Sequence, residues 1–229
     1  MNTLSKLSLA VVALSLSSIA FAQDEVTSVK DLNTSSTAIQ VDTPYQKPKA
    51  TRITPELSLI SSTFVGSDAN NAKSITKISL GGTIDIGEGN LVTETGILFR
   101  QIGASETPTI NSKPLDVETD LNYMSVPVAA KYYFSNQHDS SFFAKVGIAP
   151  SLLIGNKLAS ATQGPNFRNS DPNSFALDGL VGLGGKYQIT SQIGIVLEAS
   201  YWRAATPVYS GSSIYTSNFV NTLGININL

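Results

Sequence analysis

Hydrophobic and polar residues alternate along most of this chain, with a period of two residues from about Thr54 to the C-terminus. This period is typical of β-strands, whose successive side chains point to opposite faces of a sheet. The pattern predicts eight strands, at about residues 54–65, 73–86, 91–102, 119–134, 141–154, 175–189, 192–205 and 215–229. Each is longer than a typical globular strand and long enough for a tilted strand that crosses a membrane in about 9–11 residues.

The connections between the predicted strands alternate between long and short. "GASETPTINSKPLDVE" and "NKLASATQGPNFRNSDPNS" are long, whereas "GEGN", "SNQHDS" and "TSQ" are short. Outer-membrane β-barrels have this pattern, with long loops outside the cell and short turns in the periplasm. An even number of strands places both ends of the barrel on the side of the short turns.

One face of each predicted strand is apolar, and the other is polar, small and sparsely charged. A soluble sandwich or lipocalin-like barrel would turn the polar face to water, and that face would need more charge than Gly, Ala, Asn and Thr provide. A membrane barrel turns the apolar face to lipid and the polar face to the lumen. We therefore predict an all-β fold: an eight-stranded, antiparallel, up-and-down transmembrane β-barrel. Tyr132, Phe134, Phe142 and Tyr187 are predicted to point outward at the periplasmic interface, where aromatic girdles form.

The first 52 residues lack the period of two. Lys6 precedes the apolar run "LSLAVVALSLSSIAFA", and Ala20-Phe21-Ala22 matches an A-x-A cleavage site, so residues 1–22 are predicted to be a signal peptide. An uncleaved anchor is the alternative, although a spanning helix needs about 20 apolar residues. Residues 23–52 have few large apolar side chains and are predicted to be a flexible, disordered periplasmic linker before the barrel domain at 53–229.

Composition and charge narrow the classes of partner. Charged residues make up 14% of the chain, the formal net charge is −2, and cysteine is absent. Nothing in this balance favours a nucleic-acid partner, and the lack of cysteine excludes disulfides and thiolate metal sites. Export and the barrel pattern predict the outer membrane of a Gram-negative bacterium. The expected partners are outer-membrane lipids, the barrel assembly machinery during biogenesis, and an unknown extracellular ligand or protein.

The predicted inner face collects five acidic and five basic residues: Glu56, Lys77, Asp85, Glu94, Arg100, Lys131, Lys145, Asp178, Lys186 and Glu198. They could form an ion or solute pathway, or a mutually neutralising structural network that plugs the lumen. We favour the network, because eight strands leave an interior that side chains just fill, and near-equal numbers allow every charge to be paired. Lys131 and Lys145 should be neighbours across "SNQHDS", so carboxylates must compensate them. The candidates are Glu94, Asp178 and Glu198.

Two prolines interrupt the predicted wall. Pro127 and Pro150 should lie near each other on adjacent strands, and Pro127 should fall opposite about Ala149. Proline cannot donate to a β-ladder, so each should mark a bulge or a break in pairing. They are either two separate irregularities or a weakened seam that admits a lipid or apolar ligand.

The chain offers no catalytic, metal or cofactor site. His138, Asp139 and Ser140 are consecutive residues in a turn, which cannot hold the geometry of a hydrolytic triad. His138 is the only histidine, and no tight carboxylate cluster supports a metal site. "GLVGLGGKYQI" has spacing like G-x-G-x-x-G, but the chain alternates with period two there. Its glycines are therefore predicted to ease barrel curvature and close packing.

The stretches "YMSVPVAAKYYF", "FFAKVGIAPSLLIG", "LDGLVGLGGKYQI" and "IGIVLEASYW" resemble the PorT-like family of small outer-membrane β-barrel domains, which are similar in architecture to OmpA- and OmpX-type barrels. The resemblance covers about Pro55 to Leu229. It implies an eight-stranded barrel in a Gram-negative outer membrane and no catalytic residues. One departure is that "GININL" ends on Leu229, where such strands commonly end on an aromatic residue read by the assembly machinery.

These observations predict a non-enzymatic barrel with a structural, receptor-like or assembly-linked role, which presents extracellular loops over a largely plugged lumen. A small channel or lateral conduit for apolar solutes is the main alternative. An outer-membrane lipid-modifying enzyme is a further one.

Overall fold

The computed structural model describes residues 51–69, 71–107, 109–110, 113–114, 117–135, 139–160 and 171–229. Its strands are β1 (Thr51–Val65), β2 (Ile75–Ile86), β3 (Leu91–Glu106), β4 (Thr109–Ile110), β5 (Lys113–Pro114), β6 (Val117–Ser125), β7 (Val128–Tyr133), β8 (Ser141–Ser160), β9 (Phe175–Gln188), β10 (Ile193–Ala204) and β11 (Tyr215–Asn228). The predicted signal peptide, nearly all of the predicted linker, and His138 lie outside the described residues. Since β1 begins at Thr51, Arg52 belongs to the first strand.

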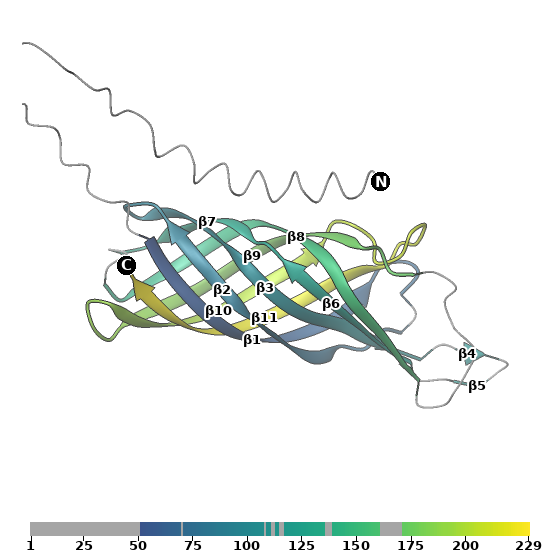
Figure 1. The fold of residues 1–229 in the computed structure, drawn as a ribbon. Coiled ribbons are helices and arrows are strands. Elements are labelled where there is room, and N and C mark those ends of the chain that lie inside the picture. The colour runs from purple at the N-terminus through teal and green to yellow at the C-terminus, as the bar shows by residue number, and fades with distance from the viewer. Residues whose placement is uncertain are drawn as a thin grey trace, which may run out of the picture. The chain divides into compact units, whose positions relative to one another are not determined.

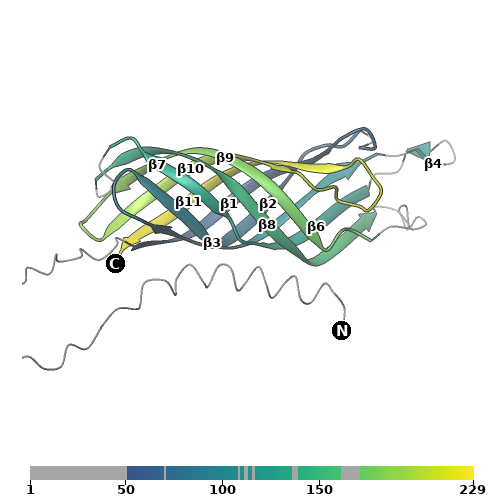
Figure 2. The same ribbon diagram turned by 90° about the horizontal axis from the view of Figure 1, so that it is seen from above.

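The strands form a closed antiparallel barrel (Figure 1). β1 pairs with β2 on one side and with β11 on the other, which closes the ring. β6 and β7 together form one wall strand, because both pair with β3 and with β8. The described residues therefore give a ring of eight wall strands, as predicted, and Figure 2 shows their common tilt. β4 and β5 pair only with each other, in the connection between β3 and β6.

Large apolar side chains cover the outside of the barrel. Leu57, Val146, Leu183 and Leu197 are all more than half exposed, which a water-soluble barrel would not tolerate over its whole circumference. The four aromatic residues predicted at the periplasmic interface, Tyr132, Phe134, Phe142 and Tyr187, are also exposed, and they lie near the strand ends that meet the short turns. No described helix is long and apolar enough to cross a bilayer.

Polar side chains fill the interior. Ser58, Thr83, Asn218 and Asn226 are buried, and Ser58 Oγ lies 2.8 Å from Thr222 Oγ1 across the β1–β11 pair. This arrangement of apolar residues outside and polar residues inside is the reverse of a soluble protein and matches a membrane barrel.

The end of the barrel with the longer loops contains an apolar cluster. Inward side chains of the wall, including Ile60 and Trp202, pack there against Val208, Tyr209 and Ile214 from the β10–β11 connection. The latter three are 2–3% exposed. The sequence predicts this connection as an exposed loop, whereas the structure folds its apolar residues over the mouth of the lumen.

The glycine-rich stretch of β9 is a strand, as its period of two predicts. A Cβ at Gly184 would lie 2.3 Å from Phe143 Cζ, and one at Gly182 would lie 3.3 Å from Lys145 Cγ. These glycines therefore make room for side chains of β8 that point into the barrel.

Candidate functional site

The centre of the lumen is built around two lysines that face each other on adjacent strands. Lys131 of β7 and Lys145 of β8 are paired directly in the ladder, as predicted. Glu94 of β3 compensates both: its Oε2 lies 2.9 Å from Lys131 Nζ and its Oε1 lies 2.6 Å from Lys145 Nζ. One carboxylate thus removes the repulsion that two opposed lysines would otherwise create.

Further carboxylates extend this contact in both directions. Asp85 of β2 lies 3.3 Å from Lys131 Nζ and accepts a hydrogen bond of 2.7 Å from the Tyr133 hydroxyl. Glu198 of β10 lies 2.8 Å from Lys145 Nζ. Asp85, Lys131, Glu94, Lys145 and Glu198 therefore form one chain of ion pairs across the lumen, and none of their side chains is more than 6% exposed. We call these five residues the luminal ion chain.

Aromatic rings support Lys131 within the luminal ion chain. Lys131 Nζ lies 4.3 Å from the centre of the Phe143 ring and 5.4 Å from that of Tyr133. Arg52 and Lys186 also approach the Tyr133 ring, at 5.4 and 5.9 Å. Arg52 is 1% exposed, and it is absent from the predicted luminal residues because residue 52 was assigned to the linker. The signal was available, since Arg52 shares the parity of Thr54 and the other inward residues of β1.

A second, separate cluster surrounds Arg100 of β3. Its guanidinium pairs with Asp178 at 2.5 Å, donates to Ser125 and Ser151 at 2.8 and 3.1 Å, and stacks 4.4 Å from the centre of the Trp202 ring.

The prediction that Asp178 compensates the two lysines is therefore wrong. Lys145 pairs in the ladder with Gly182, and Asp178 lies four residues further along β9. That separation is about 13 Å at roughly 3.3 Å per residue, too far for an ion pair.

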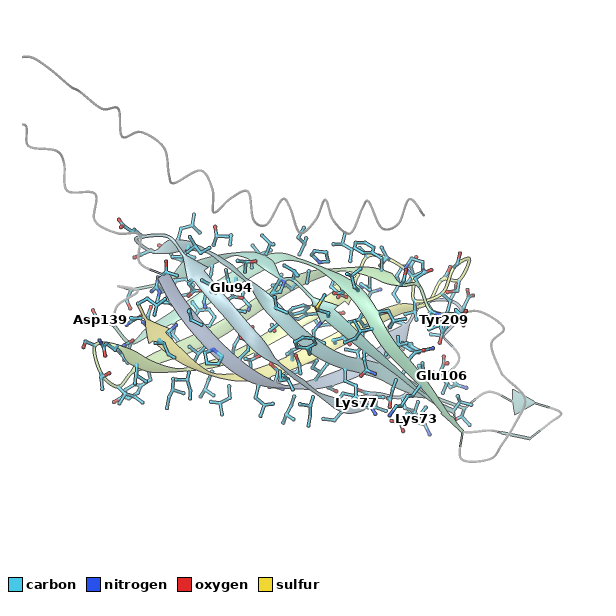
Figure 3. The ribbon with its side chains drawn as sticks, viewed as in Figure 1. Lys73, Lys77, Glu94, Glu106, Asp139 and Tyr209 are labelled. Carbon is cyan, nitrogen blue, oxygen red and sulfur yellow. The ribbon has the colours of Figure 1, made fainter. Side chains whose placement is uncertain are left out.

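Lys77 lies near the end of the barrel with the longer loops, close to Lys73 and Glu106 (Figure 3). It pairs with Glu118 and Asp120 of β6, each at 2.7 Å, and not with the luminal ion chain. Neither carboxylate was among the predicted luminal residues, because both fall at the edge of a predicted strand, next to the long loop.

A small cavity lies in the lumen between these clusters. This cavity of about 10 Å³, room for about one water molecule, is lined by residues that include Glu56, Lys145, Glu198, Pro127 and Trp202. Glu56 is the remaining predicted luminal carboxylate, and it accepts a hydrogen bond of 3.4 Å from Thr83 Oγ1. All ten predicted residues thus point inward or to the rim, and the ladder decides which of them meet.

The wall is interrupted where the prolines were predicted to lie. Pro127 separates β6 from β7, while the register continues across it, since Ser125 pairs with Ser151 and Val128 pairs with Ile148. Pro127 therefore lies opposite Ala149, as expected. The Val126 amide donates to the Pro150 carbonyl at 2.9 Å, but Pro150 has no N–H with which to return the bond. Pro150, which itself lies within β8, therefore leaves one hydrogen bond of the β7–β8 wall unmade, opposite Val126 and next to Pro127.

Metal ligands do not gather among the described side chains, where no group of three His, Cys, Asp or Glu could hold an ion. Asp139 and Ser140 are exposed in the turn before β8.

Comparisons with known proteins agree with this architecture. The chain matches the family model of the outer membrane protein beta-barrel domain over residues 40–228. No curated protein matches significantly. The outer membrane protein OprG from Pseudomonas aeruginosa is similar in structure, with a TM-score of 0.54 at 12% identity over 79% of this chain and 96% of OprG. Neisserial surface protein A also matches, with a TM-score of 0.44 at 13% identity over 76% of this chain and 96% of that protein. The Escherichia coli outer membrane protease OmpT matches with a TM-score of 0.45 at 11% identity over 80% of this chain and 98% of OmpT.

Proposed function

Because the chain belongs to the outer membrane protein β-barrel domain family and is an outer-membrane β-barrel, we propose that it is a closed scaffold that presents its long loops outside a Gram-negative cell. On this proposal the barrel has a structural, receptor-like or assembly-linked role and conducts no solute. It is exported by its signal peptide and inserted by the barrel assembly machinery.

The observation that carries this proposal is the luminal ion chain. Its five side chains reach from β2 through β7, β3 and β8 to β10, so a permeating ion would have to separate buried pairs. Leaving one partner of a buried pair uncompensated costs about 3–5 kcal/mol. The apolar cluster of Val208, Tyr209 and Ile214 adds a second barrier at the mouth.

The lateral conduit is less well supported than the closed scaffold. Pro127 interrupts the wall and lines the cavity, but Glu56, Lys145 and Glu198 line it too. An apolar solute entering there would meet desolvated charges, and burying apolar groups against them returns little free energy.

A non-catalytic role fits the chemistry of the described lumen. Its central carboxylates are held by lysine ammonium and arginine guanidinium groups, so they are engaged in ion pairs and are not free to activate a nucleophile. Incubating the protein with phospholipid and lipopolysaccharide should therefore release no fatty acid or deacylated product.

Planar-bilayer recording tests the closed scaffold. The wild type should show no steady unitary conductance. The double variant Glu94→Ala/Lys145→Ala, which removes the centre of the luminal ion chain, should open measurable conductance, while the exposed Lys157→Ala serves as a matched control on β8. Steady conductance by the folded wild-type barrel would overturn the proposal in favour of a channel.

Topology provides an independent test. Protease added to intact cells should cut within residues 155–174 and spare residues 135–140, since the long loops are proposed to face outside. Cleavage confined to residues 135–140 would mean that the barrel has the opposite orientation.

A further inference from the structure

The lipid-facing wall of β10 ends in a cation. Ile193, Ile195 and Leu197 are exposed apolar residues, and Tyr201 and Arg203 follow them on the same face. The ten residue steps from Ile193 to Arg203 cover about 33 Å along the strand, or about 25 Å in height for a tilt of roughly 40°. The apolar band of an outer-membrane barrel is about 25 Å tall, so Arg203 lies at its upper boundary.

Arg203 is part of a small polar cluster. The Tyr201 hydroxyl lies 2.9 Å from Ser217 Oγ, and the Arg203 guanidinium on the same face of the strand interacts with it electrostatically. In the ladders Arg203 pairs with Ser217 on one side and with Gly179 on the other. A Cβ at Gly179 would meet only the Arg203 carbonyl oxygen, at 4.0 Å, so the wall is notched beside the arginine. We call Tyr201, Arg203 and Ser217 the outer cation cluster.

The outer cation cluster lacks an acidic partner. Among the described carboxylates, none forms an ion pair with Arg203. The guanidinium carries five N–H donors in a planar fork that matches a phosphate, so it can hold an anion of the surroundings in two parallel hydrogen bonds.

Exposed charge is distributed unevenly between the two ends of the barrel. The exposed basic residues in the described part of the chain are Lys73, Lys157 and Arg203, and all three lie toward the long loops. The short turns carry exposed Glu88 and Asp139 instead. Figure 3 shows Lys73 and Asp139 at opposite ends. The long-loop end also carries the exposed carboxylates Asp68 and Asp171, so the asymmetry concerns the basic residues alone.

Hydroxyl groups continue the polar surface around the wall. Thr63 of β1 pairs with Ser217, and the exposed Ser61 and Ser74 lie with their Oγ atoms 2.8 Å apart. Thr76 is exposed beside them. Such a row of hydroxyls can hydrogen-bond to the sugar part of a lipid headgroup, and it suits a sugar better than it suits an apolar partner.

We propose that the outer cation cluster binds the phosphate of a phosphorylated glycolipid in the outer leaflet, with Arg203 as the principal ligand. The orientation of this site toward the outer leaflet rests on the proposed function, which places the long loops outside. Tyr201 orients the guanidinium, and the notch at Gly179 leaves room beside it for the headgroup.

The test uses the full-length barrel refolded in detergent micelles and titrated with bisphosphorylated lipid A, with the same lipid A after enzymatic removal of its phosphates as the comparison. Native mass spectrometry measures binding, and heat modifiability on a gel confirms that each variant is folded. The variants are Arg203→Gln, Arg203→Lys and Tyr201→Phe. Lys157→Gln is the matched control, because it removes the same charge from another exposed position.

Arg203→Gln should weaken binding of phosphorylated lipid A by about tenfold or more, as expected for loss of a charge-assisted contact. Arg203→Lys should retain part of the affinity, Tyr201→Phe should lose a few-fold, and Lys157→Gln should bind like the wild type. Equal affinity of the wild type for the two forms of lipid A, or equal losses in Arg203→Gln and Lys157→Gln, would overturn the proposed site. Because the micelle experiment does not depend on membrane orientation, the protease test can fail while this site stands.

Discussion

Replacing Lys145 with methionine tests whether the luminal ion chain stabilises the barrel. Lys145 Nζ lies 2.6 Å from Glu94 and 2.8 Å from Glu198. Methionine preserves most of the aliphatic stem and removes the charge. Glu94 keeps Lys131 at 2.9 Å, whereas Glu198 forms no other ion pair among the described residues.

The expected loss of unfolding free energy comes from the Glu198 carboxylate, which is left without its lysine. The Glu198 side chain is 6% exposed, so water cannot replace the lysine without rearrangement of the lumen. An uncompensated buried charge costs about 3–5 kcal/mol, and we expect Lys145→Met to lower the free energy of unfolding by about that amount. Adding Glu198→Gln removes the stranded charge and should restore about 0.5–3 kcal/mol, the usual range for coupled neighbours.

Urea unfolding of the refolded barrel in lipid vesicles measures both effects. With a slope of about 1–3 kcal/mol per molar urea, a loss of about 3 kcal/mol lowers the midpoint by roughly 1–3 M. Lys157→Met, at an exposed position of the same strand, should leave the midpoint unchanged. The reasoning fails if Lys145→Met unfolds at the wild-type midpoint, or if Lys145→Met/Glu198→Gln is no more stable than the single variant.

Two further variants test packing and the second luminal cluster. Gly184→Ala should lower the unfolding free energy by about 1–3 kcal/mol, because its Cβ would lie 2.3 Å from Phe143 Cζ. The control Gly185→Ala meets only ordinary contacts and should be tolerated. Equal thermal unfolding of the two variants would contradict this prediction. Arg100→Leu leaves Asp178 buried without its cation and removes the guanidinium that lies 4.4 Å from the ring of Trp202, the only tryptophan. Both the urea midpoint of unfolding and the wavelength of maximum tryptophan fluorescence should therefore shift. An unchanged fluorescence spectrum would mean that the guanidinium does not stack on Trp202.

Much of the barrel can be predicted from sequence because its signals are local. The period of two determines which way each side chain points, and the lengths of the connections place long loops and short turns at opposite ends. For this reason Lys131 and Lys145 were expected inside, next to each other across a short turn, and the structure pairs them directly. Tyr132 and Phe134 were expected outside on the same grounds and are exposed.

The sequence pattern is weaker where the strands leave the apolar band. β3 and β8 run to Glu106 and Ser160, beyond the predicted ends at 102 and 154, because the sequence there no longer alternates between apolar and polar residues. Arg52 was assigned to the linker for the same reason at the other end of the wall. Val208 and Tyr209 lie in a connection rich in turn residues, and nothing in that composition indicates that their side chains fold back over the lumen.

By itself, then, the sequence determined the fold class, the number of wall strands and the inward direction of the ten predicted luminal charges, because side-chain direction depends only on position along a strand. The partner of each charge was decided by the tertiary structure, because it depends on the stagger between strands far apart in the chain. Asp178 shows the difference: its inward direction was predictable, but a shift of four residues along β9 brings it to Arg100 and takes it away from Lys145.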